Sequence, residues 1–172
     1  LVLIQIGGLG VVAVSTFFLV VIGRKITVKE RVMIQETYNM ESLSGMVKWI
    51  LRILKGTFVV EGIGAIFFAF QFIPEYGFLK GIWYSVFHSI SAFCNAGIDI
   101  LGADSFAAYA RNPLINLTTM ILIVAGGIGY TVWFDITDNI RNFRKKGERR
   151  RGMFKILTLN SKVALTMTAI LI

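Results

Sequence analysis

The 172-residue chain contains one cysteine, one histidine and two prolines, and only 16% of its residues are charged. With the single cysteine, Cys94, the chain has neither an internal disulfide framework nor a thiolate metal cluster. Because 55% of the residues are hydrophobic and the mean hydropathy is +0.70, the composition excludes intrinsic disorder and argues against a soluble domain. It predicts an all-α, multi-pass membrane protein.

The charged residues are unevenly placed along the chain, whose formal net charge is +8. Most of the Lys and Arg residues lie in two stretches, residues 23–55 and 138–162, whereas residues 74–116 carry few. Lys and Arg accumulate in cytoplasmic loops, so we expect both basic stretches to face the cytoplasm and residues 74–116 to face outside. A patch for nucleic acid is the weaker explanation, because the sign of the charge alternates from loop to loop.

One stretch interrupts the apolar runs at membrane depth: residues 83–100, WYSVFHSISAFCNAGIDI. Its apolar, aromatic part ends at Phe93 and covers about 11 residues, whereas a membrane-spanning helix needs about 20. Irregular backbone at membrane depth is tolerated only where it is buried in protein or lines a water-filled cavity. We therefore predict a re-entrant pore loop, with a pore helix and a selectivity filter in residues 82–99.

The small residues after Phe93 suit the coordination of a dehydrated cation, which needs oxygen ligands that backbone carbonyls can supply. We predict an ion-binding filter of extended backbone formed by four residues: Cys94, Asn95, Ala96 and Gly97. Glycine adds no bulk to a pore and reaches conformations closed to other residues, so the monovalent cation is expected at Gly97 and the neighbouring carbonyls. The pore helix would direct the negative end of its dipole toward the ion.

Three polar residues near the filter are candidates for a vestibule or for support: His88, Asp99 and Asp104. The two aspartates either raise the local cation concentration or belong to an ordinary solvated loop. His88 and Cys94 are a base and a nucleophile by type, but six residues of helix place them on different faces. Because no third orienting group and no metal motif accompanies them, we expect a packed pore-helix histidine and no enzyme.

Two glycine motifs recur, Gly7-Gly8-Leu9-Gly10 and Gly126-Gly127-Ile128-Gly129. In both, an aliphatic run precedes the glycines and a basic pair follows, which predicts an internal repeat. In lipid, small residues allow helix backbones to approach closely, and glycine also permits a bend. We assign these six glycines to helix packing: Gly7, Gly8, Gly10, Gly126, Gly127 and Gly129.

These patterns predict about one and a half helix–pore loop–helix repeats, as in potassium channels, so we expect the chain to be part of a longer membrane protein. The expected order is an inner helix of a preceding repeat at 1–22, a cytoplasmic connection at 23–46, a complete repeat at 47–140, a basic cytoplasmic loop at 141–160 and the start of the next outer helix at 161–172. Within the complete repeat, the first span ends at Pro74 and the second runs over about residues 113–140.

Glu61 lies near the middle of the first of these spans, where an acidic residue marks either a functional position or a hydrogen-bonded or protonated structural group. It makes a secondary transporter with a midplane site at Glu61 the alternative to a channel-like pore. That alternative predicts inverted repeats, whereas both glycine motifs lie on spans that run toward the cytoplasm. The roles of Glu61 and Asp135 stay open.

Three motifs, QIGGLGVV at 5–12, FHSISAFCNAGIDIL at 87–101 and AGGIGYTVWFDI at 125–136, resemble the Trk/Ktr/HKT superfamily of potassium transporters, most closely the bacterial Ktr-type membrane subunit. The resemblance covers essentially the whole chain. It implies a pore-forming subunit of a potassium uptake system in the cell membrane, with four such repeats around one pore and Gly97 as a filter glycine. It also implies K+ as the transported ion, Na+ as a candidate coupling or activating ion, a homodimer and a cytoplasmic ring of nucleotide-binding regulatory subunits. No nucleic acid partner is expected.

Overall fold

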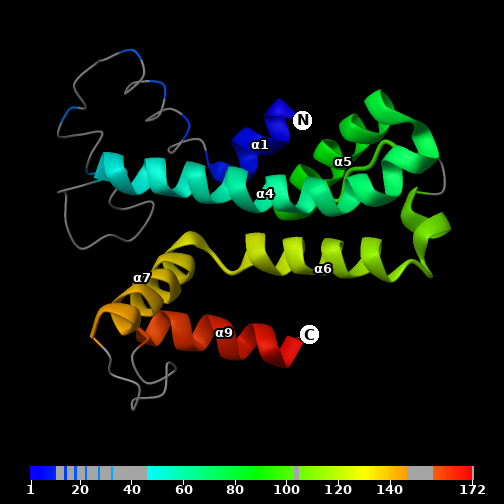
Figure 1. Ribbon diagram of the computed structural model, residues 1–172. Helices are drawn as coiled ribbons and strands as arrows, with labels where there is room; N and C mark the ends of the chain where they lie inside the picture. The colour runs from blue at the N-terminus through cyan, green and yellow to red at the C-terminus, as the bar shows by residue number, and fades with distance from the viewer. Residues whose placement is uncertain are drawn as a thin grey trace. The chain divides into compact units, whose positions relative to one another are not determined.

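The computed structural model describes residues 1–10, 46–102, 105–146 and 157–171, together with Val14, Phe18, Ile22, Thr27 and Val32. These residues are helical or irregular, and none of them lies in a β-strand (Figure 1). The predicted all-α class is therefore confirmed. The chain divides into two compact units, residues 1–126 and residues 127–172.

The first unit is built on α4 (Met46–Tyr76), a helix of 31 residues. At 1.5 Å per residue it is about 46 Å long, which exceeds the roughly 30 Å hydrocarbon core of a bilayer. Its segment Ile50–Tyr76 is long and apolar enough to cross a membrane. The prediction that Pro74 ends this span is wrong, because Pro74 lies inside the helix. A proline so close to the end disturbs one backbone hydrogen bond and leaves the last turn intact.

The next helix, α5 (Phe78–Phe93), returns along α4 and is only 16 residues long, or about 24 Å. The chain reverses at Gly77, whose φ of +79° is a conformation that favours glycine. The helix starts four residues before the predicted start at residue 82. It includes Gly81, where a Cβ would lie 2.6 Å from the Cα of Ile73. Glycine at this position therefore permits the tight contact between α4 and α5.

After α5 the chain turns back toward the end of the unit at which α5 begins. The irregular residues 94–102 lead to the short 3-10 helix η1 (Ser105–Tyr109) at the far end of α4 (Figure 1). There the hydroxyl oxygens of Tyr109 and Tyr76 lie 3.0 Å apart in a hydrogen bond. The ring of Tyr109 also contacts Phe72 edge-on, with centroids 5.6 Å apart. The segment before α5 and the segment after it thus both connect to the same end of the unit.

The third long element of this unit, α6 (Pro113–Gly127), runs antiparallel to α4 (Figure 1). Asn112 connects the two helices, because its side-chain amide donates to Gln71 Oε1 at 2.9 Å while its Oδ1 accepts backbone N–H groups in the first turn of α6. Midway along, a Cβ on Gly64 would lie 2.7 Å from a methyl carbon of Leu122. The missing side chain at Gly64 therefore allows α4 and α6 to pack closely.

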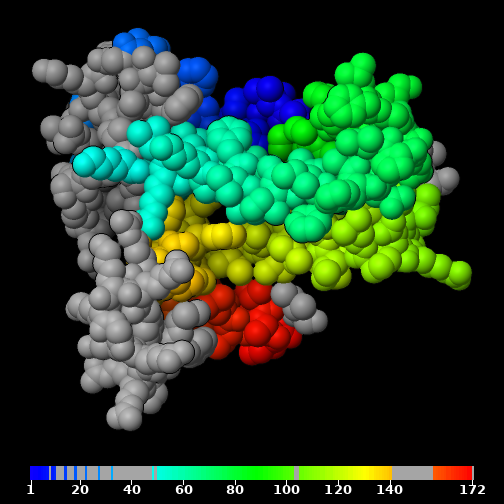
Figure 2. All heavy atoms as spheres, in the orientation of Figure 1, coloured from blue at the N-terminus to red at the C-terminus, as the bar shows by residue number. Residues whose placement is uncertain are grey.

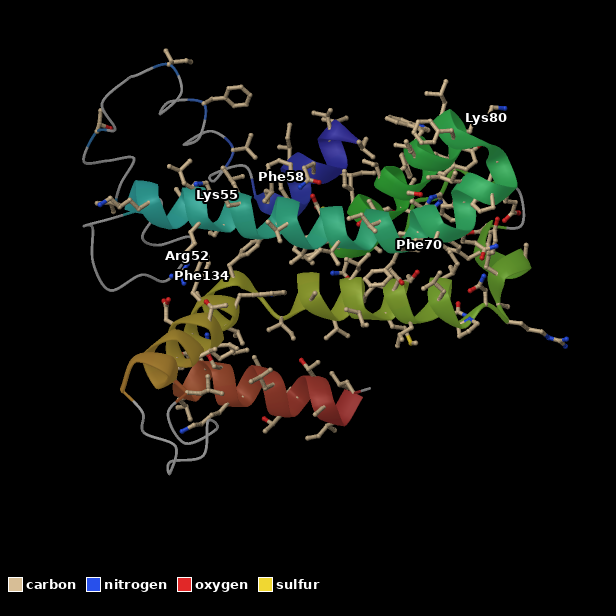
Figure 3. The ribbon with its side chains drawn as sticks, viewed as in Figure 1. Arg52, Lys55, Phe58, Phe70, Lys80 and Phe134 are labelled. Atoms are coloured by element: carbon tan, nitrogen blue, oxygen red, sulfur yellow. The ribbon has the colours of Figure 1, made fainter. Side chains whose placement is uncertain are left out.

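The core and the surface of this unit are both apolar. Phe68 and Phe72 of α4 are fully buried and stack with their ring centroids 5.8 Å apart. Outside, Phe58 and Phe70 are 60% and 68% exposed on the same helix, and they lie between Lys55 and Lys80 toward opposite ends of the unit (Figure 3). The space-filling view shows the side chains of α4 and α5 as one continuous surface (Figure 2). An apolar middle between charged ends is the pattern of a surface in contact with lipid.

At the start of the chain, α1 (Val2–Leu9) packs against α5 and ends at Gly10, whose φ is +84°. The backbone N–H of Val14 donates to the carbonyl of Gly10 at 3.3 Å, so a helical bond follows the glycine directly. Most of residues 11–45 lie outside the described part of the chain. The predicted span 1–22 and connection 23–46 are therefore described only in part.

The second unit contains α7 (Tyr130–Lys146) and α9 (Leu159–Leu171). The span predicted over residues 113–140 is interrupted, because α6 ends at Gly127 and α7 begins at Tyr130. Gly129 between them has a φ of +90°, which interrupts the helical hydrogen-bond ladder. Counted as one interrupted span, α6 with α7 gives the described residues a second segment able to cross a membrane.

The boundaries of the predicted basic loop, residues 141–160, also change. Helix α7 continues to Lys146, and α9 begins at Leu159, two residues before the predicted start of the next outer helix. Residues 147–156 lie outside the described part. Asp135 of α7 caps α9, because its Oδ2 accepts the backbone N–H and the hydroxyl of Thr158, both at 2.8 Å. This contact gives Asp135 a structural role between the two helices.

Candidate ion-conduction site

The irregular segment begins with a tight turn that Ser91 closes. The carbonyl of Ser91 accepts the backbone N–H of Ala96 at 2.9 Å. Its hydroxyl accepts the N–H of Ile98 at 3.0 Å and donates to the carbonyl of the same residue at 2.5 Å. One side chain thus satisfies both backbone groups of Ile98 and fixes the turn against the last turn of α5.

Within this turn the backbone is not an extended strand. Asn95 has a φ of +53° and Gly97 a φ of +65°, both in the left-handed region. The prediction of extended backbone is therefore wrong at these two residues. Glycine adopts this conformation freely and asparagine tolerates it better than most residues, so the local sequence fits. A Cβ on Gly97 would meet nothing within 4 Å, so conformation rather than crowding requires glycine here.

The turn presents a row of unpaired backbone oxygens. No described residue donates a hydrogen bond to the carbonyl of any of the four predicted filter residues, Cys94, Asn95, Ala96 and Gly97. They follow directly after the C-terminal end of α5, where the helix dipole places partial negative charge. Unpaired carbonyls beside that end are suited chemically to coordinate a dehydrated monovalent cation.

Beside this turn lies a cavity of about 210 Å³, whose lining includes His88, Asn95, Gly97, Asp99 and Phe106. A water molecule takes up about 30 Å³ in the liquid, so the cavity has room for several waters or a partly hydrated ion. The structure therefore brings together one predicted support residue, two predicted filter residues and one predicted vestibule residue. Asp104, the other predicted vestibule residue, lies outside the described part of the chain.

His88 is 1% exposed and packs among aromatic rings, with centroids 5.0 Å from Phe106 and 5.4 Å from Phe72. Its Nδ1 lies 2.6 Å from the carbonyl oxygen of Tyr84, so Nδ1 carries a proton and donates it. Its Nε2 has no hydrogen-bond partner among the described residues. No hydrogen bond joins His88 to Cys94, so these two residues do not form a base–nucleophile pair.

Asp99 lies at the mouth of the cavity and is held in a local turn. Its Oδ2 accepts the hydroxyl of Ser105 at 2.6 Å, and its Oδ1 accepts the backbone N–H of Leu101 at 3.2 Å. The Ser105 hydrogen bond, followed by that from Leu101, lowers the pKa of Asp99, so the carboxylate is ionised at neutral pH.

Among the described residues no group of three His, Cys, Asp or Glu side chains could hold a metal ion.

The second glycine motif supports the end of α5. A Cβ on Gly126 would lie 1.8 Å from the carbonyl oxygen of Phe93, so the backbone of α6 touches the last residue of α5. By contrast, a Cβ on Gly7 would meet no described atom within 4 Å. Close packing is therefore seen at Gly126 and not at Gly7.

The two motifs nevertheless end their helices in the same way. The final glycines, Gly10 and Gly129, have φ values of +84° and +90°. Each accepts a backbone N–H from the residue four positions later, Val14 and Trp133 respectively, at 3.3 Å in both cases. Each motif thus ends with a glycine of positive φ whose carbonyl accepts a hydrogen bond of helical spacing.

Two serines on α5 belong to the site and were missed by the sequence reasoning. Besides Ser91, Ser89 is fully buried and donates its hydroxyl to the backbone carbonyl of Glu61 at 2.6 Å. The side chain of Glu61 in turn accepts a hydrogen bond from Gln5 Nε2 of α1 at 3.1 Å. The sequence signal that could have identified these two serines is the run HSIS at residues 88–91, which places polar side chains inside an otherwise apolar pore helix.

Comparison with known proteins gives the class of the molecule. A family model, TrkH, described as a cation transport protein, matches residues 1–172. The chain is 42% identical over 170 residues to the potassium/sodium uptake protein NtpJ of Enterococcus hirae, covering 99% of this chain and 35% of that protein. It is 36% identical over 169 residues to the Ktr system potassium uptake protein B of Bacillus subtilis, covering 98% and 35%. For the protein of the same name from Vibrio alginolyticus the identity is 32% over 170 residues, covering 99% and 35%.

These matches define a membrane-embedded cation transport protein rather than an enzyme. The chain belongs to the TrkH family of cation transport proteins. It spans 35% of the length of the relatives that it matches. The resemblance seen in the three sequence motifs is therefore confirmed.

Proposed function

We propose that the chain is part of the pore-forming subunit of a potassium uptake system, and that it conducts K+ through a backbone-carbonyl filter at Cys94, Asn95, Ala96 and Gly97. The observation that carries this proposal is the row of four unpaired carbonyls at the end of a half-length helix. Replacing the hydration shell of K+ requires oxygen ligands, and carbonyls without protein partners can act as such ligands. The names of three relatives, two potassium uptake proteins and one potassium/sodium uptake protein, support K+ as the ion.

In this proposal α4, α5 with its returning segment, and α6 with α7 form one complete helix–pore loop–helix repeat. The end of the unit that bears Asp99 faces outside, and the basic stretches around residues 23–55 and 138–162 face the cytoplasm. There they would meet a ring of nucleotide-binding regulatory subunits, and the full-length subunit would form a homodimer. Na+ would act as a coupling or activating ion, in keeping with the name of the Enterococcus relative.

A second candidate function is a secondary transporter that uses Glu61 as its coupling carboxylate. One observation favours it: Glu61 is 4% exposed and accepts its side-chain hydrogen bond from a neutral amide. Intramembrane carboxylates of that kind occur in ion and proton pathways. The two candidates differ in the part that Gly97 plays, because only the first requires Gly97 in the conduction path.

The test is K+ uptake by the full-length protein in cells that lack their own uptake systems, comparing the native protein with Gly97→Asp at equal membrane abundance. Aspartate tolerates the left-handed backbone better than most residues, so the change chiefly adds bulk and charge beside the carbonyls. We expect uptake to be lost or to change its preference between K+ and Na+. Gly102→Asp is the control for backbone strain, since Gly102 also has open space around its Cβ position and its φ of +131° suits aspartate less well than that of Gly97.

Gly102→Asp should keep the native ion preference. Unchanged rate, affinity and selectivity in Gly97→Asp would remove residues 94–97 from the conduction path and would favour the transporter with Glu61.

A further inference from the structure

The contact between Gln5 of α1 and Glu61 of α4 leaves two buried oxygens without a hydrogen-bond partner. Gln5 Nε2 donates to Glu61 Oε2 at 3.1 Å, and this is the one side-chain bond that Glu61 makes. The other oxygens of the two groups, Gln5 Oε1 and Glu61 Oε1, are both buried and unpartnered among the described residues. Buried polar atoms in proteins are nearly always paired, so this double exception needs a physical cause.

An ionised Glu61 does not supply that cause. Both leftover oxygens would then be acceptors, and acceptors cannot satisfy each other. The negative charge would also be buried in a side chain that is 4% exposed, in a segment long and apolar enough to cross a membrane. Burying an isolated carboxylate is strongly unfavourable unless a cation or several donors compensate it.

The surrounding elements provide no such compensation. Helices α1 and α6 contain no ionisable side chain, and no described Lys or Arg of α4 or α5 pairs with Glu61. Cys94, at the end of α5, is a titratable group whose ionised form would be repelled by an ionised Glu61. Ser89 of α5 directs its hydroxyl to the backbone carbonyl of Glu61 rather than to the carboxyl group. Among the described residues the carboxyl group therefore has no charged partner, and its one hydrogen-bond donor is an amide; the hydroxyl of Thr57, one turn earlier on α4, is buried and unpartnered.

We propose that Gln5 and Glu61 form a proton-binding site, in which a proton on Glu61 Oε1 is donated to Gln5 Oε1. Gln5 Nε2 donates in the opposite direction to Glu61 Oε2, so the amide and the neutral acid close a ring of two hydrogen bonds. One proton taken from water thus satisfies both orphaned oxygens and removes the buried charge. The ligand of the site is a proton, and no metal ion is required.

The site joins three parts of the unit: α1 through Gln5, α4 through Glu61 and α5 through the bond from Ser89 to the Glu61 carbonyl. In the repeat order predicted from the sequence, it connects the inner helix of one repeat with the outer helix of the next. Loss of the proton would break the ring between α1 and α4, at the residue whose backbone carbonyl holds Ser89 of α5, the helix that positions residues 94–97. This inference goes beyond the proposed function and does not depend on it.

The first measurement is infrared difference spectroscopy of the purified full-length protein in lipid vesicles at neutral pH, in H2O and D2O. A protonated carboxyl group gives a C=O stretching band that is distinct from that of a carboxylate. We expect such a band in the native protein and its loss in Glu61→Gln. Glu75→Gln is the matched control, because Glu75 is an exposed carboxyl group that also accepts from a glutamine amide, Gln71. It should leave the band unchanged, and absence of the band from the native protein overturns the proposal.

The second measurement is the thermal unfolding midpoint of four variants. Glu61→Gln keeps a ring of two bonds as an amide–amide pair and should match the native midpoint. The exchange Gln5→Glu with Glu61→Gln restores an acid–amide pair in the opposite order and should match it too. Glu61→Ala and Gln5→Ala should each lower the midpoint by several degrees, on the order expected for about 1–2 kcal/mol.

Two results would overturn the proton site. One is a midpoint for Glu61→Gln as low as that for Glu61→Ala, which would mean that the negative charge is needed. The other is a midpoint that rises with Na+ or K+ in the native protein and not in Glu61→Gln, which would assign the oxygens to a metal cation. The two measurements report protonation and stability rather than uptake. A result that overturns the proton site can therefore be told apart from a result that overturns the K+ filter.

Discussion

At the base of the irregular segment, where α5 ends, the chain is enclosed by backbone and bonded hydroxyls, whereas at its mouth the side chains line an open cavity. The base is the turn from Ser91 to residue 96 together with Gly126. There Ser91 satisfies both backbone groups of Ile98, and Gly126 leaves no room beside the carbonyl of Phe93. Each of these contacts is to backbone, which cannot move away as a flexible side chain can.

The mouth consists of residues 97–102 and Ser105. Gly97 has open space around it, and Asp99 is held by one hydroxyl and one backbone N–H. Its surroundings are wet, so interactions there are weakened by solvent and salt. The comparison indicates a rigid base that fixes the geometry of the carbonyls and a mouth that adjusts how many cations reach them. Substitutions should therefore have large effects at the base and at the proposed filter residue Gly97, and small ones at the other residues of the mouth.

The largest effect is expected for Gly126→Ala. The added Cβ would lie 1.8 Å from the Phe93 carbonyl oxygen, so α6 or the end of α5 must shift. Overpacking of this kind destabilises by about 1–3 kcal/mol and sometimes more. We expect loss of K+ uptake and a lower unfolding midpoint in the full-length protein.

The control is Gly62→Ala on α4, where a Cβ would meet nothing within 4 Å. Alanine is favoured over glycine in a helix by about 1 kcal/mol, so this variant should be as stable as the native protein or slightly more so. Equal behaviour of the two alanine variants would contradict a crowded base.

An intermediate effect is expected for Ser91→Ala, which removes both bonds to Ile98 and leaves two backbone groups unsatisfied. The loss should be about 1–3 kcal/mol, and the turn should become less well defined. We predict a reduced ratio of K+ to Na+ uptake. Ser85→Ala is the matched control, because Ser85 is equally buried on α5 but its hydroxyl bonds only to Gly81 of the same helix. A native ratio of K+ to Na+ uptake in Ser91→Ala would show that the clamp, the pair of hydrogen bonds between Ser91 and Ile98, is not needed for selectivity.

The smallest effect is expected for Asp99→Asn. One exposed charge contributes about 1 kcal/mol or less in water, so the uptake rate at low K+ should fall by roughly twofold to fivefold. The difference should shrink as ionic strength rises. Glu75→Gln, which removes an exposed charge from the end of α4, serves as the control. An equal loss in both variants would attribute the effect to net charge rather than to the mouth.

The same variant has a defined pH dependence. The hydrogen bond from Ser105 lowers the pKa of Asp99, so the charge is present throughout the neutral range. It is lost only as the pH falls through that lowered value, below the ordinary range of an aspartate. The difference between the native protein and Asp99→Asn should therefore be constant around neutral pH and vanish in acid. A difference that disappears between pH 6 and 8 would contradict this assignment.

The sequence was sufficient to predict the apolar span in α4, the short helix α5 and the irregular residues that follow it, because each depends on the length and composition of a continuous segment. The helix boundaries were less predictable. Lys80 and Gly81 look unfavourable in a pore helix, yet Gly81 is needed for contact with Ile73. Gly129 was read as a packing residue, whereas its positive φ interrupts the span.

The contacts that define the site depend on residues far apart in the sequence, and so no local pattern predicted them. Gln5 and Glu61 are 56 positions apart, and Ser89 and Glu61 are 28 apart. The clamp between Ser91 and Ile98 spans seven positions, but the residues after Phe93 are not helical, so helical periodicity does not predict it. Such pairings follow from how the helices pack, which a single sequence does not determine.

The clamp at Ser91 also affects how this segment can evolve. The hydroxyl of Ser91 bonds to both the N–H and the carbonyl of Ile98. The number of residues between Ser91 and Ile98 is therefore fixed by geometry. A substitution in residues 92–97 changes a side chain, whereas an insertion or deletion would bring a different residue into the clamp and shift all the carbonyls before it. Selection should therefore preserve the length of this turn more strictly than the identity of most residues within it.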